Sequence, residues 1–194
     1  GLLKSAFVGR KTGAPIIGRS RNSIREPLAS FLYHRKIDID LRLTEVEQLR
    51  QLFAKALGYP APHTPADFGL QRSAFQSPGH QPSAMFLHGA AWPPKLWPED
   101  RWIELGKHIR SAGLNILLPW GSQAEHLRAQ RIASAIDATV LPQQSIPDLA
   151  KSLPNAQFVV GLDTGLTHIA VALGVPTATL YGPSGGGKTF LALD

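Results

Sequence analysis

Short apolar runs alternate with amphipathic helical patterns from residue 84 to residue 181, and this alternation restricts the fold more than any other feature. Runs typical of buried strands occur at 84–88, 114–118, 139–141, 157–160 and 177–181. Helical patterns separate them at 98–111, 122–136, 147–153 and 164–173. Parallel strands need such crossover helices, so the sequence predicts an α/β fold with a parallel sheet. The chain has 194 residues, 43% of them hydrophobic, which is enough to bury a core.

The sequence before residue 84 has a different character. Thr44–Glu47 is a capping-box pattern that predicts an amphipathic helix over 45–57, ending at Gly58. Five prolines then fall within 59–82, without a sustained period, which is typical of a linker. We therefore expect a first domain in residues 1–58, a Pro-rich linker in 59–83 and a second domain in 84–194.

Composition excludes several classes of protein. The chain has no Cys, which excludes disulfide scaffolds, thiolate zinc sites and cysteine nucleophiles. No apolar run approaches the roughly 18 to 20 residues that span a bilayer. Gly1–Ala6 lack both an initiator Met and a signal-peptide pattern, so we expect them to come from the interior of a longer protein.

The positive charge is concentrated in the first third of the chain. Residues 1–58 carry 11 Lys and Arg against 5 Asp and Glu, whereas residues 59–194 carry 9 of each. Such a segment attracts an anionic surface, an acidic sugar, a polyphosphate or nucleic acid, although a solvated basic face explains it equally well. Few aromatic residues are interleaved with these charges and there is no recognised nucleic-acid motif, so we expect no nucleic-acid partner.

Ligands of parallel α/β sheets bind beyond the carboxyl ends of the strands, where helix N-termini offer free N–H groups. In this sequence that rule selects four segments, residues 88–95, 119–125, 161–168 and 182–188.

Three charged residues in these segments are candidates for a binding site. Asp163 is suited to a sugar hydroxyl or a phosphate, or else it caps the helix that follows. Glu125 is suited to the two hydroxyls of a ribose, or else it is a surface residue favoured near a helix start. Lys95 lies in a stiff, aromatic-rich loop, where its charge could neutralise a diphosphate.

The segment Gly182–Thr189 matches the P-loop pattern G-x-x-x-x-G-K-[ST] and follows a predicted strand. Only Phe190–Asp194 come after it, so the helix and the metal-binding Asp of a P-loop protein have no place in this sequence. An ATPase is therefore the less favoured alternative.

Asp38 and Asp40 form a D-x-D pattern, which some sugar transferases use to hold a metal on a donor diphosphate. The alternating apolar residues Ile37, Ile39 and Leu41 instead predict a strand with both acids on its wet face. The seven His residues show no ligand-like spacing, so we expect no metal site.

Four segments, in a fixed order, carry a resemblance to a known family. They are His88–Glu99, Leu118–Glu125, Gly161–His168 and Leu180–Pro183. Together with Gly1–Ala6 and Ile17–Arg19, they resemble the lipopolysaccharide heptosyltransferases, glycosyltransferases of GT-B architecture, and most closely the type I members of that family. The resemblance extends over nearly the whole chain, up to about Pro183.

The resemblance implies transfer of L-glycero-D-manno-heptose from ADP-heptose to a Kdo residue of Kdo2-lipid A, without a metal or other cofactor. It implies a cytoplasmic protein, peripheral to the inner membrane of a Gram-negative bacterium. Residues 1–58 would belong to the acceptor-side domain and residues 84–194 to the donor-binding domain, both incomplete. The family's general base is an Asp near the start of its first domain, and no residue here matches it, so we expect a fragment that binds the donor but lacks turnover.

The resemblance also implies roles for individual residues. Lys95 would stabilise the diphosphate charge, Glu125 would bind the ribose and Asp163 the heptose hydroxyls. Thr164 and Gly165 would offer backbone N–H groups to phosphate, and His168 would support their loop. From charge alone, we expect that the acceptor is bound by Lys4, Arg19, Arg21 and Arg25.

A different class of function stays open, namely a non-catalytic module that binds anionic ligands such as lipopolysaccharide or nucleotides through its basic segment. It predicts salt-sensitive binding that Asp163→Ala does not change.

Overall fold

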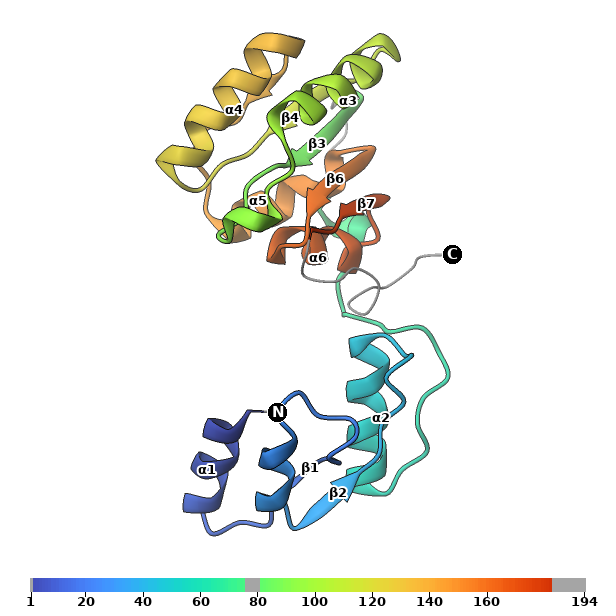
Figure 1. Cartoon of the computed structure of the whole chain (residues 1–194). Helices are drawn as coiled ribbons and strands as arrows, with labels where there is room; N and C mark the ends of the chain where they lie inside the picture. The colour runs from blue at the N-terminus through green and yellow to red at the C-terminus, as the bar shows by residue number, and fades with distance from the viewer. Residues whose placement is uncertain (1, 76–80, 183–194) are drawn as a thin grey trace. The chain divides into compact units, whose positions relative to one another are not determined.

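A computed structural model describes residues 2–75 and 81–182 of the chain (Figure 1). The chain divides into two units between Ala66 and Asp67. Each unit has its own sheet, with two strands in the first and five in the second.

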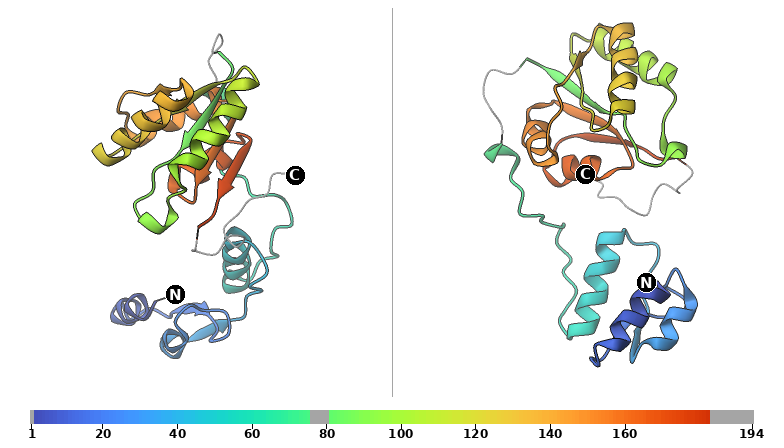
Figure 2. Two further views of the ribbon diagram at one scale, coloured as in Figure 1. Left: turned by 45° about the horizontal axis from the view of Figure 1, so that its top comes forward. Right: turned by 90° about the vertical axis from the view of Figure 1, so that its left-hand side faces the viewer.

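The second unit contains a five-stranded sheet in which all neighbouring strands are parallel, in the order β5-β4-β3-β6-β7 (Figure 2). Its strands are β3 (Ser83–Leu87), β4 (Asn115–Leu118), β5 (Thr139–Val140), β6 (Phe158–Leu162) and β7 (Thr177–Leu180). The predicted α/β class with a parallel sheet is therefore confirmed, and all five predicted strands are present within about two residues of their expected ends.

Helices cover both faces of this sheet. They are α3 (Glu99–Ser111), α4 (Gln123–Ile136), α5 (Ile146–Ser152) and α6 (Gly165–Ala172), with short 3-10 turns η2 (Arg72–Ala74), η3 (Pro93–Lys95) and η4 (Leu153–Asn155). Successive residues of a strand point to opposite faces, so Phe86 packs with α3 and α4 while Met85 packs with α5 and α6. This double cover explains why the strand residues are apolar in continuous runs.

The larger of the two cores is centred on Trp102 of α3, which is fully buried. Its ring lies 4.8 Å from the ring of Phe86 on β3 and 5.2 Å, edge-on, from the ring of Trp97. These contacts fix α3 and the loop that precedes it against the sheet, and the same loop carries Lys95.

Local sequence signals determine where the helices begin. Ser122 and Glu125 form a capping box at the start of α4, and Ser145 caps α5 by accepting a hydrogen bond from the Asp148 N–H. The predicted helix at 98–111 begins at Glu99 instead, because Pro98 occupies the N-cap position. Because these caps follow the strand ends closely, the starts of α4 and α5 lie near the carboxyl edge of the sheet.

The first unit contains two strands, β1 and β2, which pair in parallel. Ile17 of β1 lies opposite Arg35 of β2. Its elements are α1 (Leu3–Lys11), β1 (Ile17–Arg19), η1 (Pro27–Leu32), β2 (Arg35–Ile37) and α2 (Glu45–Leu57). The helix predicted over 45–57 is confirmed with its capping box at Thr44, and Gly58 ends it in the left-handed conformation, with φ of 80°. Across residues 2–75 and 81–182, no helix is long and apolar enough to span a membrane.

Candidate functional site

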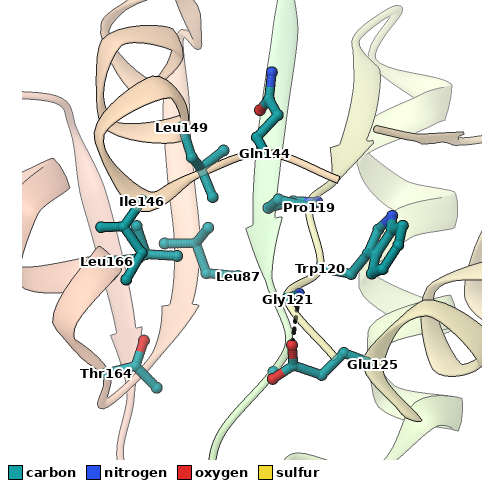
Figure 3. Close-up of a pocket in the computed structure, with 11 residues that line it drawn as sticks. Leu87, Pro119, Trp120, Gly121, Glu125, Gln144, Ile146, Leu149, Thr164 and Leu166 are labelled. Carbon is teal, nitrogen blue, oxygen red and sulfur yellow. Dashed lines mark hydrogen bonds between the residues drawn. The ribbon is translucent and has the colours of Figure 1, made fainter. Parts of the chain in front are cut away.

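The order of the strands creates a crevice at the carboxyl edge of the second unit's sheet. The chain runs from β3 to β4 on one side and later returns to β6 on the other side of β3. Connections that leave neighbouring strands in opposite directions open a crevice between them, and such switch points bind ligands in α/β proteins. A pocket of about 190 Å³ lies there, lined by Leu87, Gly89, Pro119, Trp120, Gly121, Glu125, Gln144, Ile146, Leu149, Thr164 and Leu166 (Figure 3).

The pocket has apolar walls and a few polar groups. In Figure 3, Trp120 and Glu125 lie on one side, and Ile146, Leu149 and Leu166 lie on the other. The indole N–H of Trp120 donates to the Leu141 carbonyl at 2.7 Å, and the Trp120 ring stacks on the His126 ring at 4.2 Å. A pocket with a fixed aromatic residue on one side and aliphatic side chains on the other is suited to a flat apolar ring.

Glu125 serves the helix and lines the pocket at the same time. Its Oε2 accepts hydrogen bonds from the N–H groups of Gly121 at 2.8 Å and Ser122 at 3.1 Å. A Cβ at Gly89 would overlap the Glu125 carboxylate, so the glycine allows this side chain to lie against the end of β3. Glu125 therefore stabilises the start of α4, which was the alternative interpretation of this residue. Its carboxylate also lies beside the pocket.

Lys95 and Asp163, which are far apart in the sequence, form an ion pair. The Lys95 Nζ lies 2.7 Å from Asp163 Oδ2 and also donates to the Asp163 backbone carbonyl at 3.0 Å. His168 Nε2 lies 3.4 Å from the other carboxylate oxygen, Oδ1. The side chains of Lys95 and Asp163 are only 24% and 14% exposed, so their charges are held in place at the end of β6.

Asp163 does not cap the helix that follows it. The N-cap position of α6 is Thr164, which has extended backbone angles, so the helix-capping alternative for Asp163 is wrong. The Thr164 side chain caps no N–H of the first turn, and Gly165, the first helical residue, is exposed. Thr164 lines the pocket, so this helix start lies beside it.

Behind the pocket, His88 is fully buried at the end of β3. Within residues 2–75 and 81–182 neither ring nitrogen has a hydrogen bond of good geometry, although a weak one to the Pro119 backbone opposes the fall in the pKa. Burial, followed by the positive charge of Arg128, lowers the pKa of His88 to about 4, and the carboxylates of Glu125 and Glu99 oppose this shift. The imidazole is therefore neutral at neutral pH.

The low pKa of His88 predicts that the second unit loses stability in mild acid. Below about pH 6.5 the unfolded chain takes up a proton at His88, but the folded chain does so only near pH 4. The free energy of unfolding should therefore fall by about 2 kcal/mol between pH 7 and pH 5 through this group alone. Urea unfolding at pH 7 and pH 5 measures the change. His88→Leu should remove this part of the pH dependence, and an equal loss in variant and wild type would contradict the assignment.

The four basic residues expected on the acceptor side all lie in the first unit. Arg19 is held there by Glu45 at 2.6 Å and by the Gln48 amide oxygen at 2.8 Å, so its guanidinium has structural partners. Lys4, Arg21 and Arg25 are exposed.

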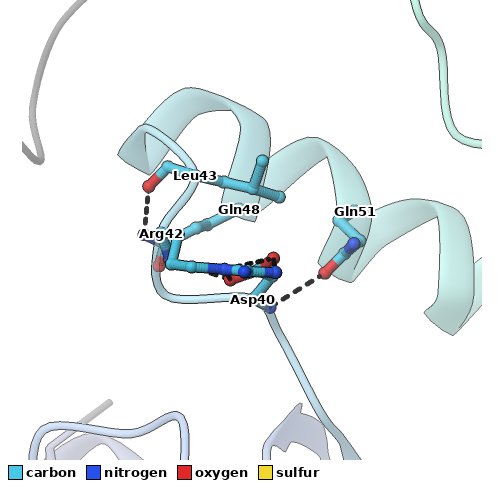
Figure 4. Close-up of polar contacts among 5 residues, drawn as sticks. All are labelled: Asp40, Arg42, Leu43, Gln48 and Gln51. Atoms are coloured by element: carbon cyan, nitrogen blue, oxygen red, sulfur yellow. Dashed lines mark hydrogen bonds and ion pairs between the residues drawn. The ribbon is translucent and has the colours of Figure 1, made fainter.

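Asp38 and Asp40 do not lie on a strand, contrary to the expectation, because β2 ends at Ile37. A turn follows in which Arg42 binds both oxygens of Asp40, and the Asp40 N–H donates to Gln51 (Figure 4). Hydrogen bonds from Arg42 lower the pKa of Asp40 to about 2. Asp38 accepts a hydrogen bond from the Ser20 hydroxyl instead. Among the described residues, no group of three His, Asp or Glu side chains could hold a metal ion.

The P-loop pattern Gly182–Thr189 lies outside the described residues, apart from Gly182. The other three strand-end segments selected from the sequence each contribute to the site: residues 88–95 and 161–168 supply the Lys95–Asp163 pair, and residues 119–125 supply Trp120 and Glu125.

Sequence reasoning missed the segment after β5, which supplies Gln144 and Ile146 to the pocket. A signal for it was present, because the strand predicted at 139–141 ends at the same edge of the sheet as its neighbours. It also missed His88 as a buried group.

Comparisons with known proteins agree with this arrangement. The model of glycosyltransferase family 9 (heptosyltransferase) matches residues 1–191. The lipopolysaccharide heptosyltransferase 1 of Pseudomonas aeruginosa is 47% identical over 97% of this chain, and that of Escherichia coli K12 is 40% identical over 95%. The chain spans 54% and 59% of the lengths of these relatives.

Solved structures give the same result. The E. coli heptosyltransferase WaaC with ADP is similar, with a TM-score of 0.80 and 39% identity over 95% of this chain and 60% of that one. WaaC with ADP-2-deoxy-2-fluoro heptose has a TM-score of 0.80 and 37% identity, over 98% of this chain and 62% of that one. The fold is thus of the GT-B heptosyltransferase type, and the chain belongs to glycosyltransferase family 9, the heptosyltransferases.

Proposed function

We propose that this chain is part of an enzyme that transfers L-glycero-D-manno-heptose from ADP-heptose to Kdo of Kdo2-lipid A, in the assembly of the lipopolysaccharide inner core. Relatives at 40–47% identity are named lipopolysaccharide heptosyltransferase 1, and the similar WaaC structures contain ADP or an ADP-heptose analogue. The observation that carries the proposal is the crevice at the carboxyl edge of the sheet, where an apolar pocket is lined by Thr164 at the start of α6 and where Lys95 is held by Asp163 at the end of β6.

In this proposal the crevice binds the donor along its length. The adenine ring occupies the apolar pocket beside Trp120, and Glu125 accepts hydrogen bonds from the ribose hydroxyls. The diphosphate binds at the start of α6, where the N–H groups of Thr164 and Gly165 and the helix dipole favour negative charge. Asp163 accepts hydrogen bonds from the heptose hydroxyls, and His168 supports it.

Lys95 is the residue that stabilises the leaving group. An ammonium group has three N–H donors, and Asp163 takes two of them, so the third can donate to a phosphate oxygen. In the reaction an acceptor hydroxyl oxygen bonds to the anomeric carbon while the bond from that carbon to the phosphate oxygen breaks. ADP leaves with the electron pair, and Lys95 opposes the charge that develops on it. The hydroxyl proton passes to a base, a role to which no residue of this chain is assigned.

The first unit belongs to the acceptor side of the enzyme in this proposal, with residues 59–83 as the linker between domains. Exposed Lys4, Arg21 and Arg25 attract the phosphates and carboxylates of the acceptor and the anionic cytoplasmic face of the inner membrane. Arg19 contributes by shaping this surface, because Glu45 and Gln48 already hold its guanidinium. Neither a metal ion nor nucleic acid has a part in this function.

Calorimetric titration of ADP-heptose, ADP and ATP into the purified chain tests the donor site. We expect the ADP compounds to bind more tightly than ATP, and Asp163→Ala and Glu125→Ala each to weaken ADP-heptose binding by about tenfold, the effect of one or two lost hydrogen bonds to a charged group. Asp100→Ala, which removes an exposed carboxylate on α3, is the matched control and should leave the affinity unchanged. An Asp163→Ala affinity equal to the wild type, or no binding by a folded sample, would contradict the proposal.

A further inference from the structure

The segment that carries Lys95 is a loop whose position is closely defined. Residues 88–98 connect β3 to α3 and contain only the short turn η3. The Lys95 N–H donates to the Trp92 carbonyl at 2.9 Å, which closes this turn. A Cβ at Gly182, two residues after β7, would lie 3.0 Å from the Pro94 carbonyl oxygen and 3.3 Å from the Lys95 Cα. The turn therefore lies directly against the end of β7.

Arg128 of α4 holds the other end of this loop. Its Nη2 donates to the backbone carbonyl of Trp97, two residues after Lys95. Its Nη1 lies 3.6 Å from the carboxylate of Glu99, the first residue of α3, and its side chain is only 13% exposed. The guanidinium of Arg128 thus joins α4 to the loop at the point where the loop enters α3.

This placement of a charge is unfavourable for stability alone. Burial lowers the pKa of Arg128, and the Glu99 carboxylate opposes the shift. The guanidinium also lies beside the N-terminus of α3, where the helix dipole disfavours a positive charge. Its Nε is buried and has no hydrogen-bond partner in the part of the chain that the structure describes. A charge held under these conditions indicates a requirement for position rather than a gain in stability.

Arg131 shows how a surface arginine of the same helix joins α4 to α3. It lies three residues after Arg128, and its Nε and Nη2 donate to the two carboxylate oxygens of Glu99 at 2.9 and 2.7 Å. Its side chain is exposed. This ion pair connects the two helices without Arg128, so the hydrogen bond to the Trp97 carbonyl is the feature that distinguishes Arg128.

We propose that Arg128 is a positioning residue for Lys95, because its hold on the Trp97 carbonyl keeps the Lys95 ammonium where the donor diphosphate binds. This inference rests on the proposed function, since it requires the diphosphate to bind at Lys95. Glu125 lies three residues before Arg128 on the same face of α4. One helix therefore sets the distance between the carboxylate that binds the ribose and the cation that binds the diphosphate. Binding groups work only within narrow limits of position, which supporting residues maintain.

The ratio of the affinities for ADP and adenosine measures this role, because only ADP has a diphosphate for Lys95 to contact. Arg128→Met should reduce the ratio about tenfold, since a displaced Lys95 keeps its charge but loses a well-placed hydrogen bond. Arg128→Lys keeps the charge and one donor for the Trp97 carbonyl, so its ratio should fall about threefold. Arg131→Met is the matched control and should leave the ratio unchanged. Titration calorimetry on folded samples gives both affinities.

A double substitution shows whether Arg128 acts through Lys95. In the Lys95→Ala chain there is no ammonium to position, so adding Arg128→Met should change the ADP affinity by less than about twofold. A purely structural role predicts instead that the two losses multiply.

An unchanged ratio in the folded Arg128 variants, or losses that multiply in the double substitution, would overturn the role of Arg128 and leave the donor site in place. If Lys95→Ala alone leaves the ratio unchanged, or if the folded wild type does not bind ADP, the proposed donor site is wrong. The role of Arg128 is then overturned with it.

Discussion

Lys95→Ala is expected to weaken the binding of ADP-heptose and of ADP by about 100-fold. The substitution removes the ammonium group that lies 2.7 Å from the Asp163 carboxylate at the end of β6. A charged hydrogen bond to a phosphate contributes about 1.5–3 kcal/mol, and the upper part of this range corresponds to a 100-fold change in affinity. The removal also takes the ammonium charge away from the mostly buried Asp163 carboxylate, whose negative charge then opposes the diphosphate. Titration calorimetry at constant ionic strength measures the effect.

Two controls separate this effect from general damage to the fold. Adenosine has no phosphate, so its affinity should change less than threefold in Lys95→Ala. Lys151→Ala removes an exposed cation on α5, paired with Asp148, and should leave the affinity for ADP-heptose unchanged. A loss of adenosine binding as large as the loss of ADP binding would contradict a role for Lys95 at the diphosphate.

Trp102→Ala should lower the free energy of unfolding of the second unit by about 4 kcal/mol. Truncation of a large buried aromatic side chain removes its transfer free energy and leaves a cavity, at a typical cost of about 3–5 kcal/mol. Trp102 is fully buried and contacts both Phe86 of the central strand and Trp97 of the loop that carries Lys95. Urea denaturation followed by circular dichroism measures the change.

A matched variant shows whether burial is the cause. Trp92 belongs to the same segment but is 50% exposed, so Trp92→Ala should cost less than about 1 kcal/mol. All four tryptophans lie in the second unit, so their fluorescence follows its unfolding separately from the first unit. A loss below about 1.5 kcal/mol in Trp102→Ala would show that the α3 core does not hold the sheet as described.

The sequence predicts most of the second unit because its signals there are local and agree with one another. The apolar run at 157–160, the cap at Ser122 and the left-handed glycines Gly113 and Gly174 each specify an element or its end without reference to the rest of the chain. The rule that ligands bind at the carboxyl edge of parallel strands then identifies the segments around Lys95, Glu125 and Asp163.

Contacts between distant segments could not be predicted in this way. Lys95 and Asp163 lie 68 positions apart, and only the strand order β3-β6 brings them together. The alternation at 37–43 suggests a longer strand, but Arg42 binds Asp40 and turns the chain after Ile37. Arg19 is a further example. Its charge alone suggested a group free to bind the acceptor, but in the fold Glu45 lies beside it and forms an ion pair with it.

A crystal structure of the chain with ADP bound tests the central claim, that the crevice between β3 and β6 is the donor site. We expect the adenine in the pocket beside Trp120, the ribose at Glu125, and the diphosphate between the start of α6 and Lys95. Binding of ADP at the glycine-rich segment Gly182–Thr189, with the crevice empty, would contradict it and would support the P-loop alternative instead.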